Sequence, residues 1–348
     1  MWNPAPMLIG GIVAPLTHCA IAMSCVVIPA QYDEALPFSE GLALVNQGEK
    51  WGFIDKTGNI VIPLTYDDGF PFTTGMALVM KGGKWGFIDP TGKPVIPLTL
   101  EGALSFAEGL AAVWMDFKWG FMDRTGAVTI APNLDWAWSF SQGLARVRIG
   151  DRWGYIDKNG DRVIPPEFDE AFDFSDDRAL IKLDRLWGYI DKKGNRVIPP
   201  QFDNARNFSE GLAAVKIGDE WGFIDRRGNL TIAAQFSNAT FFSEGLAPVQ
   251  IGEKWGYIDK NNEVAIAPQF DSADLFYQGL AAVRIGEKWG YIDPIGNRVI
   301  PLQFEEAFEF FEGMAGVRIG GKMGYIAHPN TEGNSCQSLR FNSTLSRR

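Results

Sequence analysis

Hydrophobic and polar residues alternate along this chain in short runs that are separated by turn signals. In the stretch 279–301, three apolar runs at 279–285, 289–293 and 297–301 are divided by short segments that contain glycine. In the middle run, which begins at Trp289, alternate residues fall on one face, and a period of two is the period of a β-strand. No stretch of useful length shows a helical period. The pattern therefore predicts three antiparallel strands joined by hairpin turns.

The same segment recurs every 34 residues without insertion or deletion, and Met323 replaces the Trp of the ninth unit. A Trp-Gly pair opens each middle strand, and its Trp residues are Trp51, Trp85, Trp119, Trp153, Trp187, Trp221, Trp255 and Trp289. An Asp follows each Trp at Asp55, Asp89, Asp123, Asp157, Asp191, Asp225, Asp259 and Asp293. An aromatic residue recurs at Phe72, Phe106, Phe140, Phe174, Phe208, Phe242, Phe276 and Phe310. A fixed period of this length indicates a repeat architecture.

The repeated string K-W-G-F/Y-I-D-x-x-G-N-x-V-I-P-P resembles the WG-repeat family of bacterial proteins, over residues 26 to about 326. The resemblance implies β-stranded repeats and carries no shared activity. The chain departs from the pattern at Asp177-Arg178, at Asp116-Phe117-Lys118 and at Ala327. These departures affect local turns and leave the expected fold unchanged.

A lone three-stranded meander cannot bury its apolar side chains, so the units must stack. We expect the Trp row to form the seam, that is, the buried contact between neighbouring units, so that Trp→Ala lowers the stability by about 3–5 kcal/mol. The Gly after each Trp has no Cβ, which lets another backbone segment approach closely. The fold class is all-β: about nine three-stranded antiparallel meanders over residues 26–326, either propeller-like, possibly an open ring, or an open superhelix. The propeller is favoured because Val26–Pro29 supplies a third strand and Val317–Ile326 a first and second strand, which together complete one unit.

Charge and composition restrict the chemistry. The net charge is −10 and the pI is near 4.9, so no nucleic-acid partner is expected. The residues His18, His328, Cys19, Cys25 and Cys336 all lie in the end segments. The array therefore lacks the parts of a Ser-His-Asp or Cys-His site, and it contains no glycine-rich phosphate loop. We predict no catalytic residue, no cofactor and no enzyme activity.

The repeated Asp has two interpretations. The segment 157–161 resembles part of a calcium loop. However, an Asp just before a turn glycine commonly caps the turn with its own side chain, and we favour that structural role. We therefore predict no metal site.

One variable position, two residues before the repeated Phe, changes character along the chain. Its members are Leu36, Phe70, Leu104, Trp138, Phe172, Arg206, Thr240, Asp274 and Phe308. The first five are apolar, and Trp114, Phe117 and Trp136 occupy other variable positions in the same region. Stacked units would align the apolar members into a ridge that packs beneath loops or binds a partner. The predicted partner-binding residues are Leu36, Phe70, Leu104, Trp114, Trp136, Trp138 and Phe172.

A second variable position follows the Val of the first strand and becomes basic in the later units. Its members are Asn46, Met80, Trp114, Arg148, Lys182, Lys216, Gln250, Arg284 and Arg318. This row is either a solvated face that prevents edge pairing or a site for an acidic partner.

The ends of the chain differ from the array. Within residues 1–25, the apolar stretch Met7–Ala22 resembles a signal-peptide core, and Ala20-Ile21-Ala22 resembles its cleavage site, although no Lys or Arg precedes them. This pattern predicts a secreted, periplasmic or cell-envelope protein; a plain apolar cap on a cytoplasmic protein is the alternative. Pro15 interrupts the stretch, so no membrane span is expected. Residues 327–348 are polar and are predicted to form a disordered tail.

Two functions remain open at this point. The first is a non-catalytic scaffold that binds a protein or peptide. The second is a carbohydrate-binding module that uses exposed aromatic side chains. Exposed flat rings at Trp114, Trp136 and Trp138 would favour carbohydrate, whereas buried rings would favour the scaffold.

Overall fold

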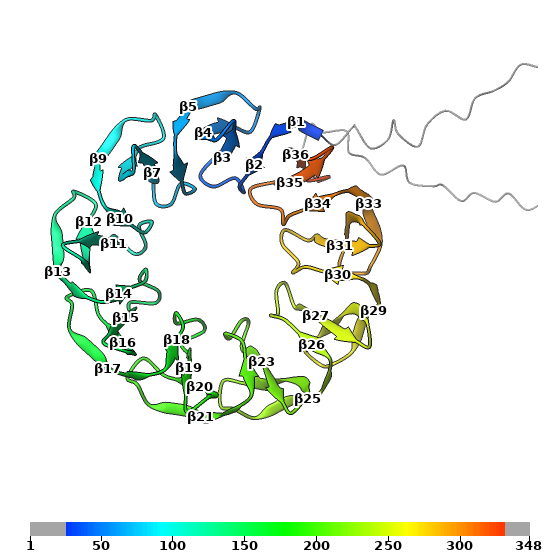
Figure 1. The fold of residues 1–348 in the computed structure, drawn as a ribbon. Coiled ribbons are helices and arrows are strands. Elements are labelled where there is room, and N and C mark those ends of the chain that lie inside the picture. Colours follow the sequence, from blue (N-terminus) through cyan, green and yellow to red (C-terminus); the bar gives the residue numbers. More distant parts are fainter. Residues whose placement is uncertain (1–25, 331–348) are drawn as a thin grey trace, which may run out of the picture.

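The computed structural model describes residues 26–330, in which all regular structure is β. Thirty-six strands form nine four-stranded antiparallel sheets, and Figure 1 shows these sheets arranged as the blades of a closed ring. No helix that could span a membrane occurs in residues 26–330. The propeller-like prediction is confirmed, and the alternative of an open superhelix is wrong.

Each blade has one strand in each of four positions from the centre of the ring outward (Figure 1). The innermost strands are β2 (Glu34–Ala35), β6 (Asp68–Gly69), β10 (Gly102–Ala103), β14 (Trp136–Ala137), β18 (Glu170–Ala171), β22 (Asn204–Ala205), β26 (Asn238–Ala239), β30 (Ser272–Ala273) and β34 (Glu306–Ala307). The second strands are β3 (Leu42–Gln47), β7 (Ala77–Lys81), β11 (Leu110–Met115), β15 (Ala145–Ile149), β19 (Ala179–Leu183), β23 (Leu212–Ile217), β27 (Leu246–Ile251), β31 (Ala281–Ile285) and β35 (Met314–Ile319). The third strands are β4 (Lys50–Asp55), β8 (Lys84–Ile88), β12 (Lys118–Asp123), β16 (Arg152–Ile156), β20 (Leu186–Ile190), β24 (Glu220–Asp225), β28 (Lys254–Asp259), β32 (Lys288–Ile292) and β36 (Lys322–Ala327). The outermost strands are β5 (Ile60–Tyr66), β9 (Pro94–Leu100), β13 (Val128–Leu134), β17 (Arg162–Phe168), β21 (Arg196–Phe202), β25 (Leu230–Phe236), β29 (Val264–Phe270), β33 (Arg298–Phe304) and β1 (Val26–Tyr32).

We number the blades 1 to 9 by their innermost strands, from β2 to β34. The innermost strand was not predicted from the sequence, because a strand of two residues is too short to show a period. It turns the expected three-stranded meander into a four-stranded blade.

The ring closes by pairing the two ends of the described chain. Strand β1 pairs antiparallel with β36 and is the outermost strand of blade 9. This pairing joins residues almost 300 positions apart, for example Ile28 with Tyr325. The expectation that the first and last strands complete one unit is therefore confirmed.

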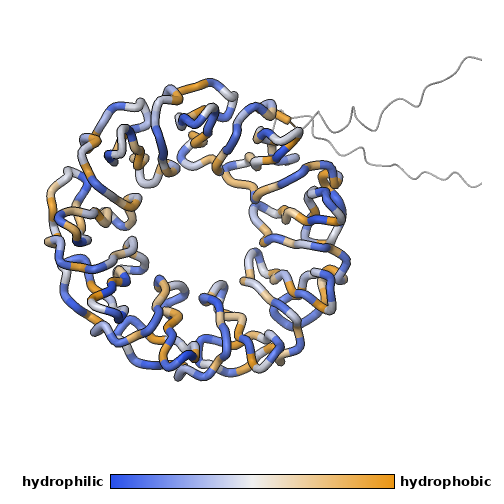
Figure 2. Tube along the Cα trace, in the orientation of Figure 1, coloured by the Kyte–Doolittle hydropathy of each residue, from blue (hydrophilic) through white to orange (hydrophobic). Residues whose placement is uncertain are grey.

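The hydrophobic core consists of nine separate clusters, one between each pair of adjacent blades. Between blades 1 and 2, for example, the ring of Phe53 lies 4.8 Å from that of Phe72, and both residues are fully buried. Figure 2 shows the corresponding hydrophobic segments in every blade around the ring. Each blade thus buries its apolar residues against its neighbours, as repeat architectures require.

The seam differs from the prediction. Only Trp119, Trp187 and Trp221 of the Trp row are buried, and the other five are half-buried. The fully buried row lies two residues later, at Phe53, Phe87, Phe121, Tyr155, Tyr189, Phe223, Tyr257, Tyr291 and Tyr325. Both rows lie on the same face of the strand, but the Trp rings lie at the margin of each cluster.

The glycine after each Trp has the predicted steric role. A Cβ atom on Gly52 would lie 2.6 Å from the Ile62 carbonyl oxygen and 2.8 Å from the Leu64 backbone nitrogen. The approach is this close because the register between β4 and β5 shifts at this point. Only a residue without a side chain fits there.

The repeated Asp caps its turn, as predicted. The amides of Thr57 and Asn59 each donate a 2.9 Å hydrogen bond to Oδ1 of Asp55. The same two bonds form at the other seven positions. These bonds and the Thr57 hydroxyl lower the pKa of Asp55. The segment 157–161 follows the same pattern, with the amides of Asn159 and Asp161 bonded to Oδ1 of Asp157.

Regular structure continues past residue 326, the expected end of the array. Ala327 is the last residue of β36, and His328 is buried with its ring 5.0 Å from Phe310. The prediction that a disordered tail begins at residue 327 is therefore wrong for these two residues. The predictions for residues 1–25 and 331–348 lie outside the described residues.

Adjacent blades are also joined by hydrogen bonds from side chains near the centre of the ring. The Glu108 carboxylate of blade 3 accepts a bond from the Gly143 amide of blade 4, at 3.1 Å, and pairs with Lys158 at 3.0 Å. At seven other interfaces a backbone amide of the next blade donates an equivalent bond to the side-chain oxygen of Glu312, Glu40, Gln142, Asp176, Glu210, Glu244 or Gln278. Thr74, at the interface of blades 2 and 3, is too short to make this bond.

We expect Thr74→Glu to stabilise the ring. Thr74 has a φ of 51°, which matches the 51° of Glu108, so the backbone already suits the substitution. The new carboxylate would accept a bond from the Gly109 amide and meet Arg124, which replaces Lys158 at this interface. One charge-assisted bond of this kind contributes about 1 kcal/mol, so the melting temperature should rise by about 1–3 °C. Thr74→Ala, which adds no acceptor, should give no rise, and an equal rise in both variants would contradict the explanation.

Candidate binding surface

Four tryptophans form a continuous contact chain across blades 3 and 4. The ring of Trp119 lies 5.6 Å from Trp114 and 5.5 Å from Trp136. Trp136 in turn lies 6.4 Å from Trp138. Trp136 is the first residue of β14 and Trp138 follows two residues later, so their side chains leave the same face of the blade.

Arg146 connects this chain to blade 5. Its guanidinium group lies 4.5 Å from the centre of the Trp138 ring and 5.3 Å from that of Phe172. Phe172 then lies 5.8 Å from Trp187. A 2.9 Å ion pair with Asp173 compensates the charge of Arg146, whose pKa is lowered by burial. We call the following set the aromatic arc: Trp114, Trp119, Trp136, Trp138, Phe172 and Trp187, bridged by Arg146.

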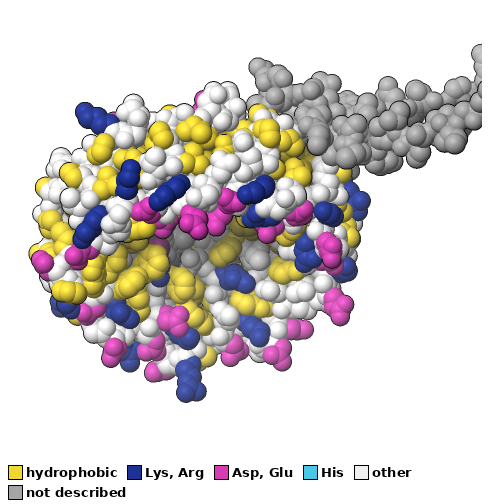
Figure 3. Space-filling view, turned by 45° about the horizontal axis from the view of Figure 1, so that its top comes forward, with side chains coloured by type: hydrophobic (Ala, Val, Ile, Leu, Met, Phe, Trp, Pro, Cys, Tyr) yellow, Lys and Arg dark blue, Asp and Glu magenta, His cyan; other side chains and the backbone are white. Residues whose placement is uncertain are grey.

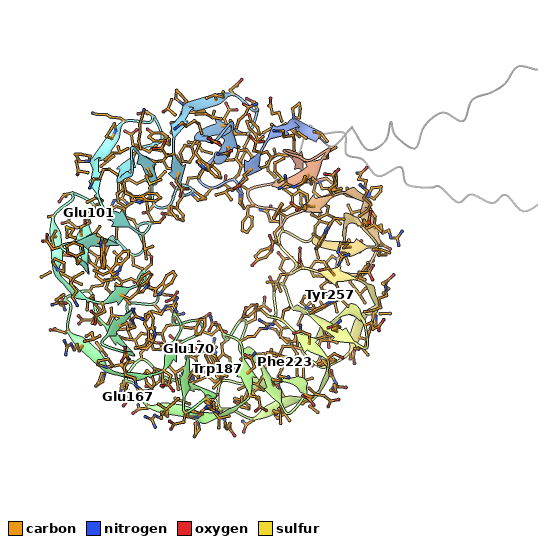
Figure 4. The ribbon with its side chains drawn as sticks, viewed as in Figure 1. Glu101, Glu167, Glu170, Trp187, Phe223 and Tyr257 are labelled. Carbon is orange, nitrogen blue, oxygen red and sulfur yellow. The ribbon has the colours of Figure 1, made fainter. Side chains whose placement is uncertain are left out.

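The arc is partly open to solvent. Trp136 and Trp138 are 38% and 37% exposed, and Trp114 is half-buried. In Figure 3, hydrophobic side chains gather on the wall of the central hollow. Figure 4 shows Glu170 and Trp187 near each other on the inner half of blade 5, whereas Glu167 lies toward the outer rim. Trp136 and Trp138 are not buried. Their ring planes are tilted by 51° to one another, so the two rings do not form one flat platform.

The predicted partner-binding residues divide into two groups. Leu104 packs against the cluster between blades 3 and 4 beside Trp114, and four further members belong to the arc itself: Trp114, Trp136, Trp138 and Phe172. Leu36 packs between blades 1 and 2, and Phe70 lies 5.8 Å from Trp85. Among the described residues, no aromatic contact joins Phe70 to the arc.

The position that carries Trp138 and Phe172 lies against the Trp of its own blade. Phe172 packs on Trp187, and in blade 6 the guanidinium of Arg206 lies 5.1 Å from the ring centre of Trp221. A charged side chain can therefore cover the Trp ring as well as an apolar one. Structural need alone does not explain why the first five blades are apolar at this position.

Asp274, in blade 8, occupies the same position and has its pKa raised to about 7. Burial disfavours its charged form, and the like charge of Glu309 adds to the effect. In the unfolded chain an Asp titrates near pH 3.9. The folded protein therefore holds this proton more strongly, and its stability falls as the pH rises from about 4 to about 7.

We expect Asp274→Asn to stabilise the protein at pH 8 and to have little effect at pH 4, because Asn resembles the neutral acid. After discounting for partial exposure, the gain at pH 8 should be about 1–3 kcal/mol. Thermal melts of both proteins across this range provide the measurement. A difference that does not depend on pH would contradict the assignment.

Two further residues belong to this region: Arg146, which was not singled out from the sequence, and Phe117, which was not among the predicted partner-binding residues. Arg146 is the single charged residue at a repeat position otherwise filled by Leu44, Leu78, Ala112, Leu180, Ala214, Pro248, Ala282 and Gly316. That contrast was a usable signal. Phe117 is 83% exposed at the tip of the β11–β12 hairpin and has a φ of 62°, a conformation that is strained for a bulky side chain.

The basic row lies beside the Trp row on the same face. Arg148 pairs across strands with Trp136 and Trp153, and Lys182 lies 5.0 Å from the Trp187 ring centre and 2.8 Å from Glu170. These cations lie on second strands, which have a partner on each side. The row therefore does not protect a sheet edge, and that interpretation is wrong.

A family model and one solved structure agree with the fold. A family model described as a WG containing repeat matches nine consecutive segments at residues 26–51, 51–85, 85–116, 119–153, 153–187, 187–221, 221–255, 255–289 and 289–322. A solved eukaryotic initiation factor is similar in fold, with a TM-score of 0.61 and 11% identity over 87% of this chain and 91% of that chain. BamB from Moraxella catarrhalis matches with a TM-score of 0.38 and 11% identity over 66% of this chain and 80% of that chain. No curated protein matches the chain.

Proposed function

The chain belongs to the WG containing repeat family, and from this premise we propose that it is a non-catalytic scaffold that binds a protein or peptide on the aromatic arc. Stacked repeats offer an extended surface on which single positions can vary without loss of the fold. Trp114, Trp136, Trp138 and Phe172 of the arc occupy such variable positions.

The observation that carries the proposal is the half-exposed pair Trp136 and Trp138. At the same two positions blade 7 has Asn238 and Thr240. The fold therefore tolerates small polar residues there, and the cost of exposing two indole rings needs another reason. Trp is enriched among the residues that dominate binding energy at interfaces.

A non-catalytic role is supported by the positions of the acidic and basic side chains. The repeated Asp residues are engaged in identical turns, so none is set apart as an acid or a nucleophile. Within residues 26–326 the sequence contains no His and no Cys. The secreted or envelope location suggested by residues 1–25 stays a prediction.

The test uses a displayed library of short random peptides, selected on the full-length protein. An enriched peptide is then labelled, and its dissociation constant is measured by fluorescence anisotropy. We expect Trp136→Asn with Trp138→Thr to weaken binding at least about tenfold, because each anchor of this kind contributes about 1–2 kcal/mol or more. Both replacements are taken from blade 7, so the melting temperature should change little.

Phe308→Thr is the matched control. Phe308 occupies the same repeat position as Trp138 and is 40% exposed, but it lies in blade 9. Its replacement should leave the peptide affinity unchanged. Equal weakening by the control, or a large fall in melting temperature of the arc variant, would contradict the proposal.

A carbohydrate ligand is the second candidate, because two half-exposed Trp rings can also stack on sugars. A glycan array run with the same variants separates the two. Glycan binding that is lost with the arc variant, together with no enriched peptide, would establish the carbohydrate function instead.

A further inference from the structure

A row of basic residues lies beside the aromatic arc, although the whole chain has a net charge of −10. Arg148, Lys182 and Lys216 occupy one repeat position in the consecutive blades 4, 5 and 6. Each pairs across strands with the Trp of its own blade, so the three cations lie on the face that carries the arc.

Some of the cations on this face are already compensated. Arg146 pairs with Asp173 at 2.9 Å, and Lys182 pairs with Glu170 at 2.8 Å. The carboxylates of Asp173 and Glu170 are engaged in these ion pairs. Within residues 26–330, neither carboxylate forms an ion pair with a second cation of this face.

In the described part of the chain, Arg148 and Arg206 lack such a partner, and Lys216 has only a long ion pair. Arg148 forms no ion pair among the described residues, and its Nε is buried without a hydrogen-bond partner. The nearby Asp135 attracts Arg148 but forms its ion pair with Lys118. Lys216 forms one ion pair, at 3.9 Å with the fully exposed Asp219, and the adjacent Asp203 accepts a bond from the Gly218 amide. In residues 26–330, no carboxylate forms an ion pair with Arg206, whose pKa is lowered by burial.

A partly buried cation without a counter-charge costs free energy that an arriving carboxylate would recover. The apolar arc in blades 3–5 overlaps around the ring with Arg148, Arg206 and Lys216 in blades 4–6, whose charges are at most weakly compensated. The surface is therefore complementary to a ligand that is both apolar and anionic.

We propose that the partner of this surface is an acidic peptide segment that also carries apolar side chains. Its apolar groups pack on Trp136 and Trp138, and its carboxylates pair with Arg148, Arg206 and Lys216. This inference rests on the proposed function and adds the chemistry of the partner.

Phe117 lies at the tip of the hairpin that carries Trp114 and Trp119 of the arc. Its ring is 83% exposed and covers nothing, and its backbone conformation is costly for a bulky residue. The equivalent residue in other hairpins is small or charged, such as Glu49 or Gly83. Packing does not require a Phe here, whereas a partner with apolar side chains gives it a role.

The experiment compares peptides selected from the random library on the wild-type protein with those selected on the double variant Arg148→Gln, Lys216→Gln. Gln is the natural residue of blade 7 at this position, so the fold should be retained. Arg162→Glu, an exposed cation on the outermost strand of blade 4, is the control. We expect wild-type peptides to be enriched at least about twofold in Asp and Glu, and their affinity to fall about tenfold on the double variant and not on the control.

Several results would overturn this inference. Peptides that bind through Trp138 but are neutral or basic would refute the acidic partner and leave the proposed function intact. Unchanged affinity on the double variant would do the same. No selected peptide at all would refute both, and stronger binding of single-stranded DNA than of acidic peptides would point to a polyanion.

Discussion

Replacing Gly188 by Ala is expected to destabilise blade 5 by about 3 kcal/mol or more, one of the two largest effects we predict. The new Cβ would lie 2.6 Å from the Ile198 carbonyl oxygen and 2.6 Å from the Pro200 nitrogen. Both are backbone atoms, so no side-chain rotation can relieve the clash, and forced backbone shifts in a packed region are costly. Strand β21 would have to move away from β20, which breaks their shared pairing.

Hydrogen exchange is the best measurement for this variant, because a repeat array can open locally before it unfolds globally. Protection should fall in β20 and β21 first. Gly82→Asn is the control, since Gly82 has open space around it and Asn tolerates its φ of 60°. If the two variants lost protection equally, the steric explanation would be wrong.

The second large effect is expected for Phe53→Ala, at about 3–5 kcal/mol. Phe53 is fully buried between blades 1 and 2, so its loss leaves a cavity lined by both blades. Trp51 lies two residues earlier on the same face but is half-buried, and water can fill the space it leaves. Trp51→Ala should therefore cost less, about 1–2 kcal/mol.

This pair of variants tests which aromatic row is the seam of the ring. Chemical denaturation of both proteins, side by side, gives the comparison. A larger loss for Trp51→Ala than for Phe53→Ala would restore the original expectation that the Trp row carries the interface.

Local features were read correctly from the sequence because each repeats at one interval. The period of two located the longer strands, the Asp before each turn glycine identified its capping role, and the Gly after Trp indicated a close backbone. These signals depend on neighbours within a few residues, and nine copies distinguish them from chance. The two-residue innermost strands gave no such signal and were missed.

The binding surface was predicted only in part, for a related reason. The contrast between Trp138 and Thr240 at one repeat position pointed to the right blades. The contact between Trp119 and Trp136, however, joins two blades, and the bridge from Arg146 to Phe172 joins another two. No spacing along the chain reveals that these particular side chains meet.

The sequence by itself determined the repeat, its strands and turns, and the residues that vary among otherwise identical units. Only the tertiary structure decided that the ring closes, that the Phe and Tyr row is the seam, and that four tryptophans and Arg146 form one surface. The physical reason is the range of the interactions. Turns and strand periods depend on adjacent residues, whereas closure depends on β1 meeting β36 at the far end of the described chain. Burial likewise depends on how far each side chain extends into the space between two blades, which no spacing along the chain specifies.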